Sequence, residues 1–183
     1  MGRTSTASPA VAASAGRSGL AATASESGAL HRRRQLLRIG LVALAVPDAI
    51  VGAWLLFAPR SFYDNFPGFG HRWVGALGPY SEHPLTDFGG ALLALALLTC
   101  LAALWMERRL VQAALLTVLL ESVAHFVYHL TRLGALPTAD DVANQLSLAY
   151  GIVLSLALLF LAQRIGWGTP TESAAENLGA ASS

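Results

Sequence analysis

The sequence contains no lysine: all 12 of its basic residues are arginine, which is typical of a GC-rich bacterial gene. Charged residues of both signs make up only 13% of the chain, against about 25% in an ordinary soluble domain. The formal net charge of +1 gives no sign of a nucleic-acid partner. The single cysteine, Cys100, excludes an intramolecular disulfide bond and a multi-cysteine metal site. These scarcities argue against an ordinary soluble domain.

Hydrophobic residues are abundant instead, at 54% of the chain, and they are concentrated in four long runs. The runs cover residues 39–57, 86–105, 110–130 and 142–162. Each has about 20 residues, which as a helix spans the roughly 30 Å hydrocarbon core of a bilayer. Backbone polar groups in lipid must be bonded within their own segment, so the runs must be helices. The sequence therefore predicts an all-α, four-transmembrane-helix bundle with a long loop between the first two helices.

Two terminal segments, residues 1–30 and 168–183, are rich in small and polar residues and show no hydrophobic period. Such segments bury too little surface to offset the entropy of ordering, so we expect disordered tails around a membrane domain at residues 31–167. Arg33 and Arg34 resemble the start of a twin-arginine export signal. The run that follows is long enough to span and lacks a small-x-small cleavage site, so we expect the first helix to be retained.

The arginines also predict the orientation of the helices, because cytoplasmic loops carry an excess of basic residues. With the N-terminus in the cytoplasm, nine arginines lie on the cytoplasmic side and three on the outer side. We therefore expect a multi-pass protein of the cell membrane, with the lipid bilayer as its surroundings and both termini in the cytoplasm. The loops at residues 58–85 and 131–141 would then lie outside.

The third run contains ionisable residues, each of which costs about 2.5–3.5 kcal/mol to insert at the centre of a membrane helix. Glu121, His125 and His129 follow one another at intervals of four residues. At 100° per residue, the three side chains lie on one face of the helix, one above another. Asp48 lies on the first helix at about the depth of Glu121, and Asn144 begins the fourth run on the outer side.

The long outer loop is rich in aromatic residues, which suit the membrane interface, and it ends in Glu82, His83 and Asp87. Topology places these three residues at the same membrane face as the ladder on the third helix. We therefore predict an outward-facing pocket for a metal ion or a small polar ligand, with redox or hydrolytic chemistry open to it. Its ligand-binding residues would be Glu82, His83, Asp87, Glu121, His125 and His129.

Within that pocket, Glu82, His83, His125 and His129 form a candidate divalent metal site, because imidazole and carboxylate suit Zn, Fe, Cu or Mn. A haem is less favoured, since His125 and His129 share one helix and cannot lie on opposite faces of one iron. The sequence shows no nucleophile motif and no glycine-rich phosphate loop, so it gives no nucleotide signature and leaves open whether the protein is an enzyme.

Two alternatives remain open at this point. In the first, the polar residues only fix helix packing in a non-catalytic interaction or scaffold subunit: Glu121 shares a proton with Asp48, and His129 pairs with Asp140 or Glu82. In the second, Asp48 and Glu121 form the proton path of a proton-coupled small-molecule carrier. Four helices are few for a carrier, so that reading requires a homo-oligomer.

Several motifs resemble a known group of proteins. Gly78-Pro79-Tyr80-Ser81-Glu82-His83 and the His-x-x-x-His pattern of residues 125–129 are the most specific. Over residues 36–165 the chain resembles a group of small, uncharacterised four-helix bacterial integral membrane proteins, and its overall plan is similar to that of the wider DoxX-like class. The resemblance implies the four-helix fold and the membrane location. It keeps the two histidine motifs together, which favours a shared site.

Overall fold

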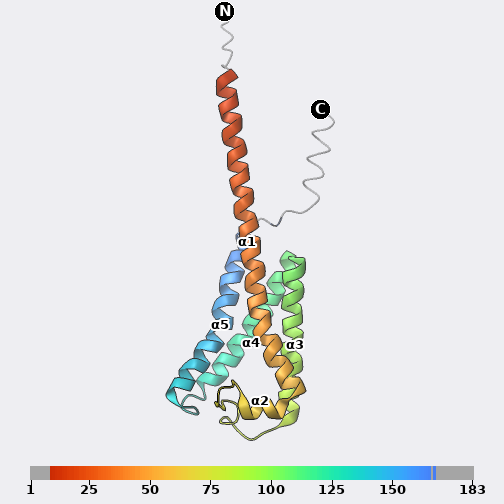
Figure 1. Ribbon diagram of the computed structural model, residues 1–183, viewed down its shortest axis with the longest axis vertical. Coiled ribbons are helices and arrows are strands. Elements are labelled where there is room, and N and C mark those ends of the chain that lie inside the picture. Colours follow the sequence, from red (N-terminus) through yellow and green to blue (C-terminus); the bar gives the residue numbers. More distant parts are fainter. Residues whose placement is uncertain (1–8, 166, 168–183) are drawn as a thin grey trace, which may run out of the picture.

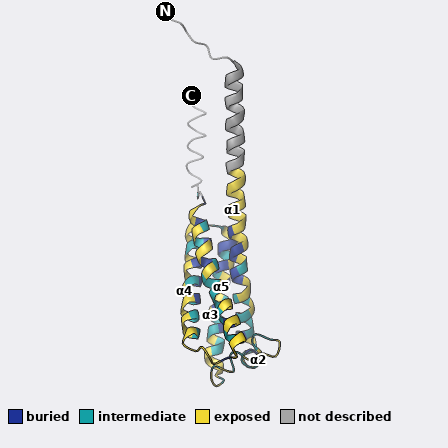
Figure 2. Cartoon of the chain, turned by 90° about the vertical axis from the view of Figure 1, so that its left-hand side faces the viewer, coloured by how far each residue is buried: buried dark blue, intermediate teal, exposed yellow. Residues whose placement is uncertain are grey.

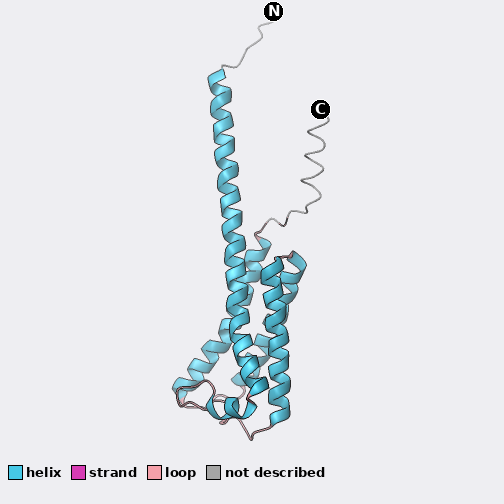
Figure 3. Ribbon diagram, turned by 45° about the vertical axis from the view of Figure 1, so that its right-hand side comes forward, coloured by secondary structure: helices cyan, strands magenta, loops and turns pink. Residues whose placement is uncertain are grey.

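The computed structural model describes residues 9–165 and 167, with side chains described from residue 27 onward. Its helices are α1 (Pro9–Phe57), α2 (Pro59–Asn65), α3 (Glu82–Trp105), α4 (Arg108–Leu130) and α5 (Thr138–Gln163). The described part of the chain contains helices and loops and no strand (Figure 3). The predicted all-α fold is therefore confirmed.

Four helices are long and apolar enough to cross a membrane, and they identify a multi-pass integral membrane protein. They are Ser27–Phe57 within α1, and the whole of α3, α4 and α5. α3 begins one turn earlier than the sequence predicted, at Glu82. The hydroxyl of Thr86 lies inside this first turn and donates to the carbonyl oxygens of Glu82 and His83, at 3.1 and 2.9 Å. Pro84 is tolerated there because the first turn needs no amide donor.

The N-terminal segment differs from the prediction. α1 begins at Pro9, so helix covers residues 9–30, where the sequence predicted a disordered tail. The segment is rich in alanine, the best helix former, and it continues an existing helix. Extending a formed helix avoids the unfavourable nucleation step that an isolated segment must make. The rest of the predicted tails, residues 1–8 and 168–183, lies outside the described residues.

The spanning helices are arranged as two antiparallel pairs, α1 with α3 and α4 with α5 (Figure 1). α2, the loop of residues 66–81 and the loop of residues 131–137 lie at one end of the bundle, here called the loop end. The span of α1 begins and α5 ends at the opposite end. The two pairs diverge toward the loop end.

Small residues hold each pair together. Gly52 of α1 lies against Gly89 of α3 so closely that a Cβ atom on either would meet main-chain atoms of the other helix at 3.0 Å or less. In the second pair, a Cβ atom on Gly151 would lie 2.5 Å from the hydroxyl oxygen of Ser122. Small residues of this kind let membrane helices approach closely. The backbones of α1 and α3 are therefore in near contact, whereas in the second pair the Ser122 side chain lies against the main chain of α5.

The main hydrophobic core joins the two pairs at the end opposite the loops. Leu37 and Leu41 of α1, Val111 and Leu115 of α4 and Leu158 of α5 are at most 5% exposed. Figure 2 shows the buried residues concentrated in the half of the bundle farther from α2. The same end is tied by the Arg38 guanidinium, which donates to the Ala103 carbonyl oxygen at 3.0 Å.

Candidate functional site

A cavity of about 470 Å³ lies at the loop end, between the two helix pairs. α1, α3, α4 and α5 contribute to its walls, and α2 and the loop of residues 66–81 close one side. Most of its lining is apolar or aromatic, and Phe62, Phe66, Trp73 and Phe88 are part of it. Ligand sites typically measure about 300–1,000 Å³ and combine such a lining with a few polar groups. The cavity therefore has the size and character of a small-molecule site.

Four polar residues of the cavity form one continuous chain of hydrogen bonds from α4 to α5. Nδ1 of His125 is 3.3 Å from Oε1 of Glu121, and Nε2 of His125 is 3.1 Å from Nε2 of His129. Nδ1 of His129 is 2.9 Å from the side-chain amide nitrogen of Asn144, which is only 6% exposed. The predicted ladder on α4 is thus present, and α5 extends it by one residue.

The chemistry of these contacts fixes the direction of donation. The amide nitrogen of Asn144 can only donate, so Nδ1 of His129 accepts and the proton of a neutral His129 lies on Nε2. His129 then donates to Nε2 of His125, whose own proton lies on Nδ1 and is donated to Glu121. One assignment of two neutral histidines satisfies every contact. Reversing the direction of donation requires the Asn144 amide to rotate and present its oxygen to Nδ1 of His129.

Asp48 of α1 lines the same cavity as Glu121, and the two side chains are close enough for their charges to interact. Within the described part of the chain, no hydrogen bond or ion pair reaches the Asp48 carboxyl group. The chain of α4 therefore ends at Glu121 without including Asp48. Nearby, Tyr150 of α5 donates its hydroxyl to the carbonyl oxygen of Ala43 at 3.0 Å, which links the second pair to α1.

Three of the predicted site residues lie elsewhere. Glu82 and His83 are on the first turn of α3 and Asp87 is on the second, and none of the three lines the cavity. The side chains of His83 and Asp87 are 87% and 67% exposed and lie 3.5 Å apart. The prediction of one six-residue pocket was therefore wrong. The sequence predicted the correct end of the bundle, but it could not say toward which side of the bundle the start of α3 points.

The predicted metal set is likewise not assembled. Among the described residues, no group of three or more His, Cys, Asp or Glu side chains is placed to hold a metal ion. His125 and His129 bond to each other, so these two nitrogens are already paired, and the predicted partners Glu82 and His83 are remote from them. The suggested pairing of His129 with Asp140 or Glu82 was also wrong, because His129 bonds Asn144.

The loop end is held in place by aromatic and ionic contacts. Phe62 stacks on Phe66 at 4.5 Å between centroids, and Trp73 meets Phe66 edge-on at 5.9 Å. Nδ1 of His71 lies 3.0 Å from the carboxylate of Asp140 at the start of α5. This contact connects the loop of residues 66–81 to the second helix pair across the cavity.

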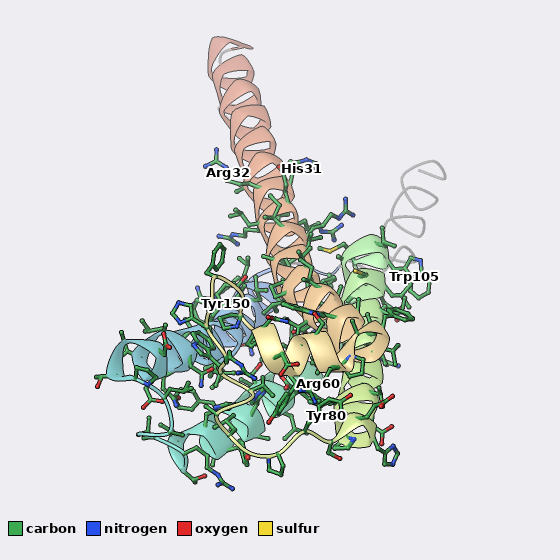
Figure 4. All side chains as sticks on the ribbon, turned by 60° about the horizontal axis from the view of Figure 1, so that its bottom comes forward. His31, Arg32, Arg60, Tyr80, Trp105 and Tyr150 are labelled. Carbon is green, nitrogen blue, oxygen red and sulfur yellow. The ribbon has the colours of Figure 1, made fainter. Side chains whose placement is uncertain are left out.

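Outside the cavity, α2 carries an ion-pair network. Asp64 accepts from Arg60 at 2.7 Å and from Arg72 at 3.0 Å. The hydrogen bond from Arg60, together with the charges of both arginines, holds the pKa of Asp64 below its usual range. Arg60 also lies 5.0 Å from the ring centre of Tyr80, and Figure 4 shows the two side by side at the loop end, whereas Tyr150 lies on α5. This network fixes the path of the loop that closes the cavity.

Several cavity residues were not predicted as site residues. Asn144 was recognisable as a polar residue at the start of a span, although the sequence did not identify its partner. Ser122 and Ser147 gave the same weak signal within spans. Trp73 and Tyr128 gave none, because interfacial aromatic residues are common in membrane proteins whether or not they line a site.

The remaining guide to function would be similarity to known proteins. No family model matches the chain, and neither a curated protein nor a solved structure is significantly similar to it.

Proposed function

We propose that this membrane protein binds a small amphiphilic molecule in the loop-end cavity and exchanges a proton with it. The observation that supports this is the combination of a cavity of about 470 Å³, an apolar and aromatic lining, and a few polar side chains, among them Asp48 and Glu121. In the proposal, the apolar part of the ligand lies against the aromatic residues. Its polar head meets Asp48 and Glu121.

The proton exchange is supported by the hydrogen-bond chain from Glu121 through His125 and His129 to Asn144. Imidazole can accept a proton on one nitrogen while it releases another from the second nitrogen. Glu121 is the group that faces the ligand. When Glu121 takes the Nδ1 proton of His125, Nε2 of His125 takes the proton of His129, and Nδ1 of His129 takes one from water at the loop end; the reverse sequence returns it. The Asn144 amide exchanges no proton and only turns its oxygen toward the new N–H of His129.

We also propose that the loop end faces the outside of the cell and that both termini are cytoplasmic. The excess of arginines at the opposite end supports this orientation. The test uses single cysteines in a Cys100→Ala background, at the exposed positions Ala76 of the loop end and Glu107 of the opposite end. A membrane-impermeant maleimide added to intact cells should label Ala76→Cys and leave Glu107→Cys unlabelled. The reverse pattern would overturn the orientation.

Ligand binding is tested by filling the cavity. Ser147 lines it, and its hydroxyl bonds only the carbonyl oxygen of Asn144, one turn earlier on its own helix. Ser147→Trp should therefore occupy the space and remove binding. Val153→Trp is the matched control, because Val153 is on the same helix, 65% exposed and outside the cavity lining.

The probe is a photoreactive long-chain alcohol that carries a diazirine, used on the full chain in detergent micelles. We expect labelled peptides from α4 and α5 in the wild-type protein and in Val153→Trp, with competition by excess unlabelled alcohol. Labelling of these peptides should be lost in Ser147→Trp. Equal labelling in Ser147→Trp and Val153→Trp would mean that the alcohol reaches only the lipid-facing surface, which would refute the proposal.

One observation favours the scaffold alternative. Glu121, His125, His129 and Asn144 satisfy one another, so packing alone explains them without a ligand. That reading predicts no competed labelling in the cavity for any probe. It leaves the uncovered carboxyl group of Asp48 without an explanation, which is why ligand binding is preferred here.

A further inference from the structure

We infer that the molecule bound in the loop-end cavity is an organic cation, a lipophilic amine whose ammonium group meets Asp48 and Glu121. The inference rests on the proposed function, because it names the class of ligand for the same cavity. It is carried by the charges of the lining: two carboxyl groups line the cavity, and among its described lining residues there is no arginine.

The two carboxyl groups differ in whether a neighbouring side chain already forms a hydrogen bond with them. Glu121 accepts a hydrogen bond from His125 at 3.3 Å. Asp48 receives none from the described part of the chain, and it faces the same space. A carboxyl group at membrane depth needs a proton or a positive partner, since burial of an unpaired charge is strongly unfavourable. Asp48 is therefore the natural first contact for an ammonium group.

The apolar lining suits the same class of ligand. Phe62, Phe66, Trp73, Phe88 and Tyr128 all border the cavity. The face of an aromatic ring carries negative charge density, so a cation positioned over it is attracted, most strongly where water is excluded. The alkyl or aryl part of an amine would be covered by the same rings. A lining that combines aromatic rings with carboxyl groups therefore fits both parts of a lipophilic amine.

Other head groups fit the cavity less well. An anionic head would face Asp48 and Glu121 without any arginine to bind it, because the loop-end arginines are all outside the lining. Arg60 and Arg72 are bonded to Asp64, and Arg132 lies over the ring of Tyr128. A neutral alcohol would meet no repulsion, but it would not supply the positive partner that an ionised Asp48 needs. The charges of the lining therefore predict that the cavity binds an amine head group best, an alcohol less well and a carboxylate least.

Binding of an amine also accounts for every proton. A neutral amine crosses the bilayer and enters the cavity, where its nitrogen lone pair takes the proton of a carboxylic acid group. The O–H bond breaks, an N–H bond forms, and an ammonium–carboxylate pair remains. No oxidant or further reactant is needed. When the amine leaves as a neutral molecule, its N–H proton returns to the carboxylate and restores the carboxylic acid.

The test compares three diazirine probes with the same alkyl chain and a tertiary amine, an alcohol or a carboxylic acid as head group. The full chain is reconstituted in phosphatidylcholine nanodiscs and labelled over a range of probe concentrations. We expect the amine to label the cavity peptides of α4 and α5 at a concentration at least tenfold lower than the alcohol. The acid should label them least.

Three variants complete the test. Asp48→Asn and Glu121→Gln should each lose most of the preference for the amine over the alcohol, and a single symmetric gel-filtration peak in detergent reports that each is folded. Glu82→Gln, an acid at the same end but exposed and outside the cavity lining, should keep the preference. An amine preference that survives in both folded carboxyl variants would overturn the inference.

The experiment distinguishes failure of the amine inference from failure of the proposed function. Equal labelling by amine and alcohol in the wild-type cavity would overturn the amine inference and leave the proposed function intact. The absence of competed cavity labelling by all three probes would overturn the proposed function itself.

Discussion

The contact between Gly52 and Gly89 leads to a sharp prediction about Gly89→Ala. A Cβ atom at Gly89 would lie 2.7 Å from the amide nitrogen of Leu56, 2.8 Å from Cβ of Leu55 and 2.9 Å from the carbonyl oxygen of Gly52. Two of these three atoms belong to the main chain, so no side-chain rotation can relieve the overlap. The helices α1 and α3 must move apart instead.

The size of the effect follows from these distances. The shortest contact must grow by about 0.7 Å to reach ordinary van der Waals separation at 3.4 Å. A radial gap of about 0.5–1 Å already forfeits a quarter to a half of the dispersion energy of the atoms along it. Overpacking of this kind costs about 1–3 kcal/mol. Since 1.4 kcal/mol is tenfold in an equilibrium constant, the unfolding equilibrium should shift by roughly 5- to 150-fold.

Gly90→Ala is the matched control, because it is the same substitution on the next residue, and nothing lies within 4 Å of the added Cβ atom. Both variants gain about the same helix propensity, roughly 1 kcal/mol, so their difference isolates the steric cost. The assay is equilibrium unfolding of the purified protein in mixed micelles with increasing denaturing detergent. Equal stability of the two variants would show that α1 and α3 do not pack as described.

Two further predictions concern the α4–α5 hydrogen bond and the loop-end ion pairs. Asn144→Leu removes the donor to His129 and should lower stability by about 0.6–1.7 kcal/mol in a detergent melt, whereas Gln145→Leu should not, because the buried side-chain oxygen of Gln145 has no partner in the described structure. A larger loss from Gln145→Leu would contradict this assignment. Asp64→Asn should speed proteolysis of the loop of residues 66–81 at pH 7, because its carboxylate bonds Arg60. Because the pKa of Asp64 is lowered in the folded protein, its ion pair stabilises the loop fully above the unfolded pKa of about 3.9. This stabilisation is lost as the pH falls and Asp64 is protonated. The wild-type protein and Asp64→Asn should therefore be cut equally fast in strong acid. A difference that persists there would exclude the ion pair as its cause.

Much of the fold was predictable because membrane helices are defined by local properties. The length and hydropathy of each run identify a span without knowledge of its neighbours, and four spans were predicted and found. The ladder of Glu121, His125 and His129 was predictable for the same reason, since spacing along one helix sets the relative direction of side chains. Its internal bonding is thus a property of α4 itself.

The rest depended on how helices face one another, which one chain's local pattern does not contain. Glu82, His83 and Asp87 were placed at the correct end, yet the rotation of α3 turns them away from the cavity. Asp140 was expected near His129 and instead contacts His71 of a distant loop. The resemblance to small four-helix bacterial membrane proteins stays a prediction, since no family model matches.

The position of the cavity follows from a change of character along one face of α1. Leu37, Leu41 and Leu44 repeat at intervals of three and four residues, and Asp48 continues the same interval. The leucines are at most 3% exposed, whereas Asp48 is only partly buried and borders the cavity. Apolar residues on this face can pack against any apolar neighbour, but a carboxyl group packs only against a partner that bonds or neutralises it.

α4 changes in the same way and at the same depth. Val111, Leu115 and Val118 are almost fully buried, and the face then continues into Glu121 and His125. The polar groups of α4 find their partners along α4 and α5, so none of them bonds α1 across the cavity. A ligand that bonds Asp48 and Glu121 together would add a second polar link between the pairs, beside the one from Tyr150 to Ala43. Bound at a hundred times its dissociation constant, it would stabilise the bundle by about 2.7 kcal/mol.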